Sequence, residues 1–131
     1  MRIFIPALVF EDCFVDNVQQ TLSEMGHEVV TLGSAKYKSY WSLPRYAARV
    51  ARGMVRGDQP TREGFKIIKL ARETKPDLVL SLTGLLHPVV LEELGKIVPG
   101  RRVLWWGDPP ANSQEWGIVD PGWDWIGVIP Q

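Results

Sequence analysis

Short apolar runs alternate along the chain with longer segments in which apolar residues recur every three or four positions. Continuous apolar runs are typical of buried parallel strands, and the longer spacing is typical of helices that pack on them. The pattern predicts strands at residues 2–8, 27–32, 77–82, 101–106 and 124–129, with helices at 14–25, 61–75 and 88–97. We therefore expect an α/β fold: a Rossmann-like three-layer αβα domain over residues 1–131, with a parallel five-stranded sheet in the order 3-2-1-4-5.

Residues at the expected helix ends support these boundaries. Asp12 is a favoured N-cap residue ahead of the first helix, and Gly26 stands where a C-terminal glycine belongs. Thr61 or Asp58 would cap the second helix. That helix must end near residue 75, because Pro76 disfavours helical geometry at the residue before it.

The spacing also predicts which side chains face the core. Trp105 and Trp106 point to opposite faces of a regular strand, so we expect one of them under each helical layer. The residues expected to face inward from the helices are Phe14, Val15, Val18, Leu22 and Met25 in the first helix, and Phe65, Ile68 and Ala71 in the second.

A chain of 131 residues is long enough to bury a core without disulfides. Its 15 basic and 15 acidic residues balance, so the net charge favours no nucleic-acid partner. Cys13 is the single cysteine, which excludes an intrachain disulfide and a cysteine metal cluster, and we expect no metal site. With no signal-peptide pattern and no apolar run long enough for a bilayer, we expect a cytoplasmic protein.

Residues 33–60 are predicted to form an irregular basic and aromatic excursion between the second strand and the second helix. A solvated helix face is the ordinary interpretation of basic residues at helical spacing, and weak contact with an anionic surface is the alternative. The residues concerned are Arg45, Arg49, Arg52 and Arg56.

Residues suited to binding or catalysis come at or just after the ends of the first, third and fourth predicted strands. In an open α/β sheet, ligands bind beyond the carboxyl ends of the strands, where the strand order reverses. The sequence therefore predicts a substrate site at this edge. The predicted substrate-binding residues are Glu11, Asp12, Thr83, Gly84, His87 and Trp106, and the predicted catalytic residue is Asp108.

Most of these residues also have a purely structural interpretation. Asp12 can cap the first helix, and His87 can cap the third or face solvent. Asp108 precedes a proline and can simply turn the chain. For Trp106, packing in the core is the favoured interpretation, and stacking on a sugar ring or base is the alternative.

No nucleotide-binding fingerprint follows the first strand, because residues 6–12 contain no glycine. Dinucleotide and P-loop sites need glycine there so that the backbone can approach phosphate. The sequence therefore disfavours an NAD-dependent oxidoreductase and a P-loop NTPase.

Five short segments carry a resemblance to a known family: Met1–Ile5, Met25–Val29, Lys75–Leu80, the aromatic strand into Gly107-Asp108-Pro109, and Trp123–Ile126. Together they resemble the N-terminal domain of GT-B-fold glycosyltransferases, especially the bacterial spore-maturation-protein-like group. The matches are scattered over the whole chain, and the tryptophan-rich strand ending in Asp-Pro is the most specific.

In that family, two Rossmann-like domains face each other across a cleft, the first binding the acceptor and the second the nucleotide-sugar donor. The resemblance implies that this chain is the acceptor-binding half of a longer protein, inactive alone and without a cofactor of its own. It places Thr83, Gly84 and Asp108 at the cleft, facing a glycan or small-molecule acceptor. The glycine pair that many relatives carry after the first strand is missing, which leaves the acceptor contacts there open.

A donor domain would also account for large aromatic residues outside an obvious core. Trp116, Trp123 and Trp125 are expected to form the surface that such a domain covers. The alternative to a glycosyltransferase is a non-catalytic Rossmann- or flavodoxin-like module. Such a module would bind a small ligand at the same edge and use its exposed tryptophans for protein contacts.

Overall fold

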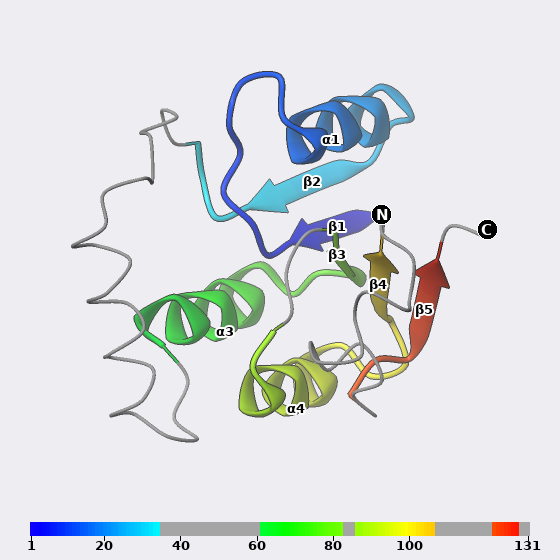
Figure 1. The fold of residues 1–131 in the computed structure, drawn as a ribbon. Helices are drawn as coiled ribbons and strands as arrows, with labels where there is room; N and C mark the ends of the chain where they lie inside the picture. The colour runs from blue at the N-terminus through cyan, green and yellow to red at the C-terminus, as the bar shows by residue number, and fades with distance from the viewer. Residues whose placement is uncertain (35–60, 83–85, 107–121, 129–131) are drawn as a thin grey trace.

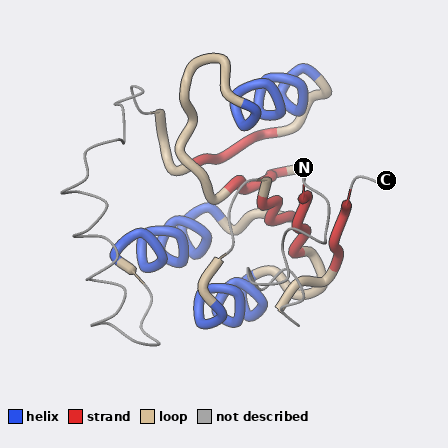
Figure 2. Tube along the Cα trace, in the orientation of Figure 1, coloured by secondary structure: helices blue, strands red, loops and turns tan. Residues whose placement is uncertain are grey.

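A computed structural model describes residues 1–34, 61–82, 86–106 and 122–128 of the chain. These residues form a twisted parallel sheet with helices on both faces, as Figures 1 and 2 show. The predicted α/β class with a five-stranded parallel sheet is therefore confirmed. Most of the predicted excursion at residues 33–60 lies outside the described residues.

Each described strand and helix lies within or close to its predicted range. None of the described helices is long and apolar enough to cross a membrane. The strands are β1 (Arg2–Ile5), β2 (Glu28–Thr31), β3 (Leu78–Ser81), β4 (Arg102–Trp106) and β5 (Trp125–Val128), and the helices are α1 (Phe14–Glu24), α3 (Arg62–Thr74) and α4 (Pro88–Ile97).

The order of the strands is β2-β1-β3-β4-β5, so the predicted order 3-2-1-4-5 is wrong. The third strand pairs with β1, placing Leu78 beside Ile3 and Val79 beside Phe4, rather than extending the sheet beyond β2. Burial explains the choice. Both faces of β3 are apolar and Val79 is fully buried, as a central strand requires, whereas β2 carries the exposed Glu28 and suits an edge.

The helices cover the two faces of the sheet unequally. Helix α1 packs on one face, whereas α3 and α4 lie side by side on the other (Figure 1). The buried residues under α3 and α4 include Phe4, Leu32, Ile67, Ile68, Ala71, Val79, Val90 and Leu94, and those under α1 include Ile3, Ile5, Val15, Leu80 and Leu82.

The ends of the helices mostly follow the predicted capping. Thr61 caps α3 by accepting a hydrogen bond from the backbone N–H of Gly64. Lys75 ends that helix in the left-handed conformation, and Gly26 follows α1 with a φ of 86°. Asp12 was predicted as the cap of α1, but the N-cap is Cys13.

Three aromatic or apolar residues predicted to face the core are instead exposed. Phe14 and Met25 lie at the two ends of α1 and are 48% and 65% exposed, and Phe65 on α3 is 57% exposed. The prediction failed because a helix of about three turns presents a narrow stripe to the sheet, and residues at the margins of that stripe remain outside. Val15 in α1 and Ile68 in α3 occupy the centre of each stripe and are buried.

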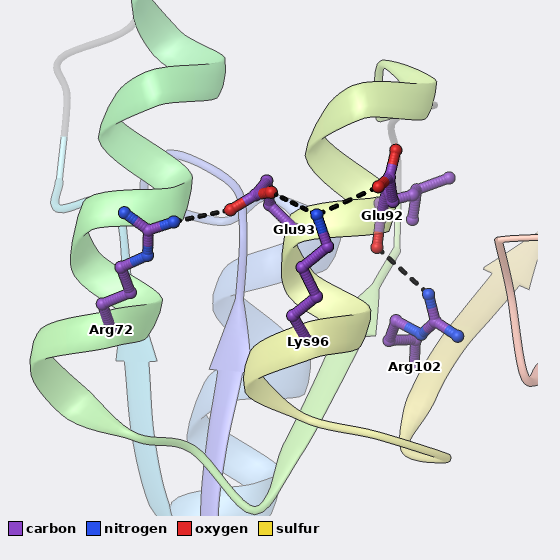
Figure 3. Close-up of polar contacts among 6 residues, drawn as sticks. Arg72, Glu92, Glu93, Lys96 and Arg102 are labelled. Carbon is purple, nitrogen blue, oxygen red and sulfur yellow. Dashed lines mark hydrogen bonds and ion pairs between the residues drawn. The ribbon is translucent and has the colours of Figure 1, made fainter.

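An arginine at the start of β4 joins three elements. The carboxylate of Asp124, just before β5, accepts hydrogen bonds from Nε and Nη2 of Arg102 at 2.8 and 3.0 Å and from its backbone N–H at 2.8 Å. The remaining nitrogen, Nη1, donates to the carbonyl of Leu91 on α4 at 3.1 Å (Figure 3). These hydrogen bonds from Arg102 hold the pKa of Asp124 below its ordinary value.

Arg2 makes a related junction at the start of β1. Its backbone N–H donates to the carboxylate of Asp77 at 2.6 Å, and Asp77 donates its own N–H to the carbonyl of Arg2 at 2.8 Å. The guanidinium turns away from Asp77, pairs with Glu28 at 2.8 Å and donates to the carbonyl of Thr74. Both junctions lie at the amino ends of the strands.

On their outer surface, α3 and α4 are linked by a chain of ion pairs. Glu93 of α4 binds Arg72 of α3, and Lys96 binds both Glu93 and Glu92 at 2.8 and 3.0 Å (Figure 3). The hydrogen bond from Lys96 is the main reason that the pKa of Glu93 lies below its ordinary value. The cations in this network are thus neutralised within the protein.

Candidate functional site

The strand order determines where the candidate site lies. From β1 the chain crosses to β2 on one side, and β3 then pairs with β1 on the other side. The order therefore reverses between β1 and β3, and in open α/β sheets ligands bind beyond the carboxyl ends of strands at such a reversal.

This reversal shifts the centre of the site away from Asp108. The predicted order would have placed the reversal between the first and fourth strands, next to Asp108. In the observed order, β4 is separated from β1 by β3. The residues that follow β1 and β3 are therefore better placed than those that follow β4. Thr83, Gly84 and Asp108 themselves lie outside the described residues.

Backbone hydrogen bonds hold the first part of the loop after β1. The N–H of Leu32 donates to the carbonyl of Ala7, and the N–H of Val9 donates to the carbonyl of Gly33, both at 3.0 Å. The loop thus continues alongside the end of β2 before it turns into α1. This pairing gives the turn at residues 10–12 a defined starting point at the carboxyl edge.

Glu11 and Asp12 form the exposed tip of that turn. Asp12 has a φ of 59°, a left-handed conformation that aspartate tolerates better than most residues, and its N–H donates to Asp16 at 3.2 Å. Neither its carboxylate nor that of Glu11 is used to cap the helix. Both carboxylates face solvent at the edge where the site was predicted.

Cys13 takes the capping role instead, a function that the sequence prediction missed. Its Sγ accepts hydrogen bonds from the N–H groups of Phe10 and Asp16, both at 3.4 Å. The thiol is half-buried between the turn and the first turn of α1. Its position just before the first periodic apolar residue was a usable signal, although cysteine is not among the favoured caps.

His87 lies at the same edge and caps α4, in agreement with its structural interpretation. Its Nδ1 accepts the N–H of Val89 at 3.3 Å, and its carbonyl accepts the N–H groups of Val90 and Leu91. With Nδ1 as acceptor, the neutral ring carries its proton on Nε2. The half-buried imidazole is held at the start of α4, whereas Glu11 and Asp12 lead into α1 on the opposite face.

Of the two tryptophans of β4, the structure describes the side chain of Trp105, which differs from the prediction. Trp105 is 46% exposed and meets the ring of Phe14 edge-on, with centroids 6.3 Å apart. It is therefore only partly covered by the helical layer. Trp106 ends β4 on the carboxyl side, but its side chain lies outside the described residues.

The tryptophans near β5 also separate into two environments. Trp123 is only 8% exposed and packs against Leu91 and Leu104, so the prediction that it belongs to an uncovered surface is wrong. Trp125 is 69% exposed. Trp116 lies outside the described residues.

The described part of the predicted site holds two exposed carboxylates ahead of α1 and a half-buried imidazole ahead of α4, on opposite faces of the sheet. Carboxylates accept hydrogen bonds from hydroxyl groups, and the free ring nitrogen of His87 donates one when neutral. Within residues 1–34, 61–82, 86–106 and 122–128, no three His, Cys, Asp or Glu side chains gather as metal ligands. Each of these groups can exchange hydrogen bonds with hydroxyl groups.

No protein-family model matches the chain, and no curated protein matches it either. The resemblance to GT-B glycosyltransferases therefore rests on the short motifs of the sequence.

Proposed function

We propose that this domain is the acceptor-binding half of a cytoplasmic glycosyltransferase that uses a nucleotide-sugar donor. Two kinds of observation support this proposal. The short motifs resemble the N-terminal domain of GT-B enzymes, and the sheet has the α/β architecture which that resemblance implies.

The observation that carries the proposal is the reversal of strand order between β1 and β3, with unpaired acidic side chains at its rim. Glu11 and Asp12 project from a turn whose backbone is anchored to β2, and neither carboxylate has an ion-pair partner among the described residues. Hydroxyl groups of a sugar or polyol are the natural hydrogen-bond donors for such groups.

Within this proposal, Asp108 orients or deprotonates the acceptor hydroxyl, and Thr83, Gly84 and Trp106 contribute to the acceptor site. The donor is held by a second domain that packs against the tryptophan-rich end. The domain alone transfers no sugar. In a protein that also carries the donor domain, Asp108→Asn is expected to lower kcat with little change in KM for the donor.

A second candidate is a small-ligand module without catalysis, and the observed strand order favours it specifically. The order 2-1-3-4-5 is that of flavodoxin-like domains, whose ligands bind at the same β1/β3 reversal. The two candidates thus share a place on the fold and differ in the ligand.

Amide chemical shifts of the ¹⁵N-labelled domain test the proposal. A panel of neutral disaccharides is expected to shift the amides of residues 10–12 and 82–87, and Asp12→Asn is expected to weaken that response. Glu92→Gln, which alters an exposed carboxylate on α4, is the matched control and should leave the response unchanged. Shifts at these loops caused by flavin mononucleotide, with none caused by the sugars, would support the small-ligand module instead.

A further inference from the structure

A second concave surface lies beside the carboxyl ends of β1 and β2, separate from Glu11, Asp12 and His87. It is an open groove of about 860 Å³ between the ends of these strands and the first two turns of α3. Leu8 and Leu32 contribute apolar surface from the strand side. The helix contributes one aromatic and several charged side chains.

The helix side of the groove is a single stripe of α3. Arg62, Phe65, Lys66 and Lys69 follow the spacing i, i+3, i+4 and i+7, which puts them on one face of a helix. The opposite face is buried in the core. Phe65 therefore presents its ring, 57% exposed, between cationic side chains instead of packing under the helix.

The cations in this groove are less neutralised than those elsewhere on the helices. Lys66 donates from Nζ to the carbonyl of Leu32 at 2.9 Å, and neither it nor Arg62 has a carboxylate partner among the described residues. Lys69 pairs with Glu73 at 3.7 Å, and Glu63 is the one acidic residue among the described residues that line the groove. Arg72 and Lys96, by contrast, are each paired with glutamate (Figure 3).

Lys66 is the anchor of the arrangement. Its hydrogen bond to the Leu32 carbonyl fixes the ammonium at the end of β2, and an ammonium has two further N–H donors. These donors lie in a groove that also offers the apolar side chains of Leu8 and Phe65. A fixed cation beside an apolar surface matches a ligand with an oxyanion at one end and an apolar body at the other.

We propose that this groove binds an organic oxyanion with an apolar chain or ring, its phosphate or carboxylate on Lys66 and Arg62 and its apolar part on Phe65 and Leu8. The site is independent of the proposed acceptor function, because it uses none of the same residues. The ligand is either a free amphiphile or the head group of a membrane lipid.

Titration of the ¹⁵N-labelled domain with monomeric n-octyl phosphate tests this site. The probe is expected to shift amides at Leu8, at Leu32 and in the first two turns of α3. Inorganic phosphate lacks the apolar part, and octyl glucoside lacks the charge, so each should bind at least about tenfold more weakly. Equal binding of octyl phosphate and octyl glucoside would overturn the proposal.

Two substitutions separate the ionic from the apolar part of the site. Lys66→Gln is expected to weaken octyl phosphate binding about tenfold, because it removes a charge-assisted hydrogen bond. Phe65→Ser should weaken octyl phosphate binding but leave the response to inorganic phosphate unchanged. Arg101→Gln removes the same charge from an exposed residue outside the groove and should change neither. An equal loss for Lys66→Gln and Arg101→Gln would show a general charge effect and overturn the site.

Phosphatidylglycerol and phosphatidylcholine vesicles identify the source of the ligand. Cosedimentation with the anionic vesicles alone, lost in Lys66→Gln, would assign the groove to a lipid head group. Binding of monomeric octyl phosphate without vesicle binding would assign it to a free molecule. If the domain bound neither octyl phosphate nor the anionic vesicles, and each variant kept an unchanged melting temperature, the proposal would be overturned.

Discussion

Two strands of the sheet begin with arginine, and comparison of the two junctions shows how similar sequences are used differently. Arg2 begins β1 and Arg102 begins β4, and each donates its backbone N–H to an aspartate just ahead of the neighbouring strand. At the edge of the sheet, the guanidinium of Arg102 also binds Asp124. At the centre, the guanidinium of Arg2 leaves Asp77 and pairs with Glu28.

The two guanidinium groups make different contacts because the two strand pairs are covered to different extents by the rest of the protein. Strands β1 and β3 have neighbours on both sides and helices on both faces. Among the described strands β5 pairs with β4 alone, and the exposed Trp125 and Ile126 show that its faces are less covered. An edge strand of four residues therefore depends more on side-chain hydrogen bonds at its start.

The largest expected effect comes from Asp124→Asn. This change leaves the guanidinium of Arg102, whose side chain is 14% exposed, without its charged partner. We expect the free energy of unfolding to fall by about 3 kcal/mol, as measured by urea denaturation. Asp77→Asn is the matched control. It alters the same kind of backbone contact without an arginine partner and should cost about 1 kcal/mol. Equal losses for both variants would contradict the comparison.

Lowering the pH should also reduce stability, by a smaller amount, because it protonates Asp124 and weakens the same contact with Arg102. The pKa of Asp124 is lowered in the folded state, so its stabilising contribution is complete above the unfolded-state pKa and is lost as the pH falls through the folded value. We therefore expect the wild-type domain to lose stability more steeply than Asp124→Asn as the pH falls below about 4. Urea midpoints measured from neutral pH downward check this expectation, and parallel curves would contradict it.

The smallest effect is expected at Gly95, where Arg102 crosses α4. A Cβ at this position would overlap the Arg102 guanidinium. Alanine in place of a helical glycine ordinarily stabilises by about 1 kcal/mol, but here displacement of Arg102 should offset that gain. Part of the gain should reappear when Gly95→Ala is combined with Asp124→Asn, since the guanidinium then keeps only its hydrogen bond to the Leu91 carbonyl and is displaced more easily. A double-mutant cycle measures this coupling, and strict additivity would contradict it.

The sequence allowed prediction of the fold class and most element boundaries because these depend on local signals. Apolar runs marked the strands, and Thr61, Lys75 and Gly26 ended or began helices as expected. Strand order is not local. It depends on which strand can bury both faces, and the apolar character of β3 decided in favour of a central place.

Chain order explains where the described residues of the predicted site lie, but it does not explain their local roles. Glu11, Asp12 and His87 follow strand ends or precede helices, so topology alone brings them to the carboxyl edge. The sequence did not predict the capping role of Cys13, because thiols are uncommon caps. The sequence did not predict the exposure of Phe65 either, because the helical period of 3.6 residues places it near the buried stripe. Only the packing of α3 on the sheet shows that Phe65 lies outside that stripe.

The thiol that caps the N-terminus of α1 has a practical consequence for work with this protein. Cys13 is the only thiol in the chain, so a maleimide dye or spin label would attach at this one position. The same sulfur holds two backbone amides, at Phe10 and Asp16. A label there would therefore loosen the turn that carries Glu11 and Asp12, and a cysteine placed elsewhere in a Cys13→Ser background is the safer attachment point, since serine keeps an acceptor for both amides.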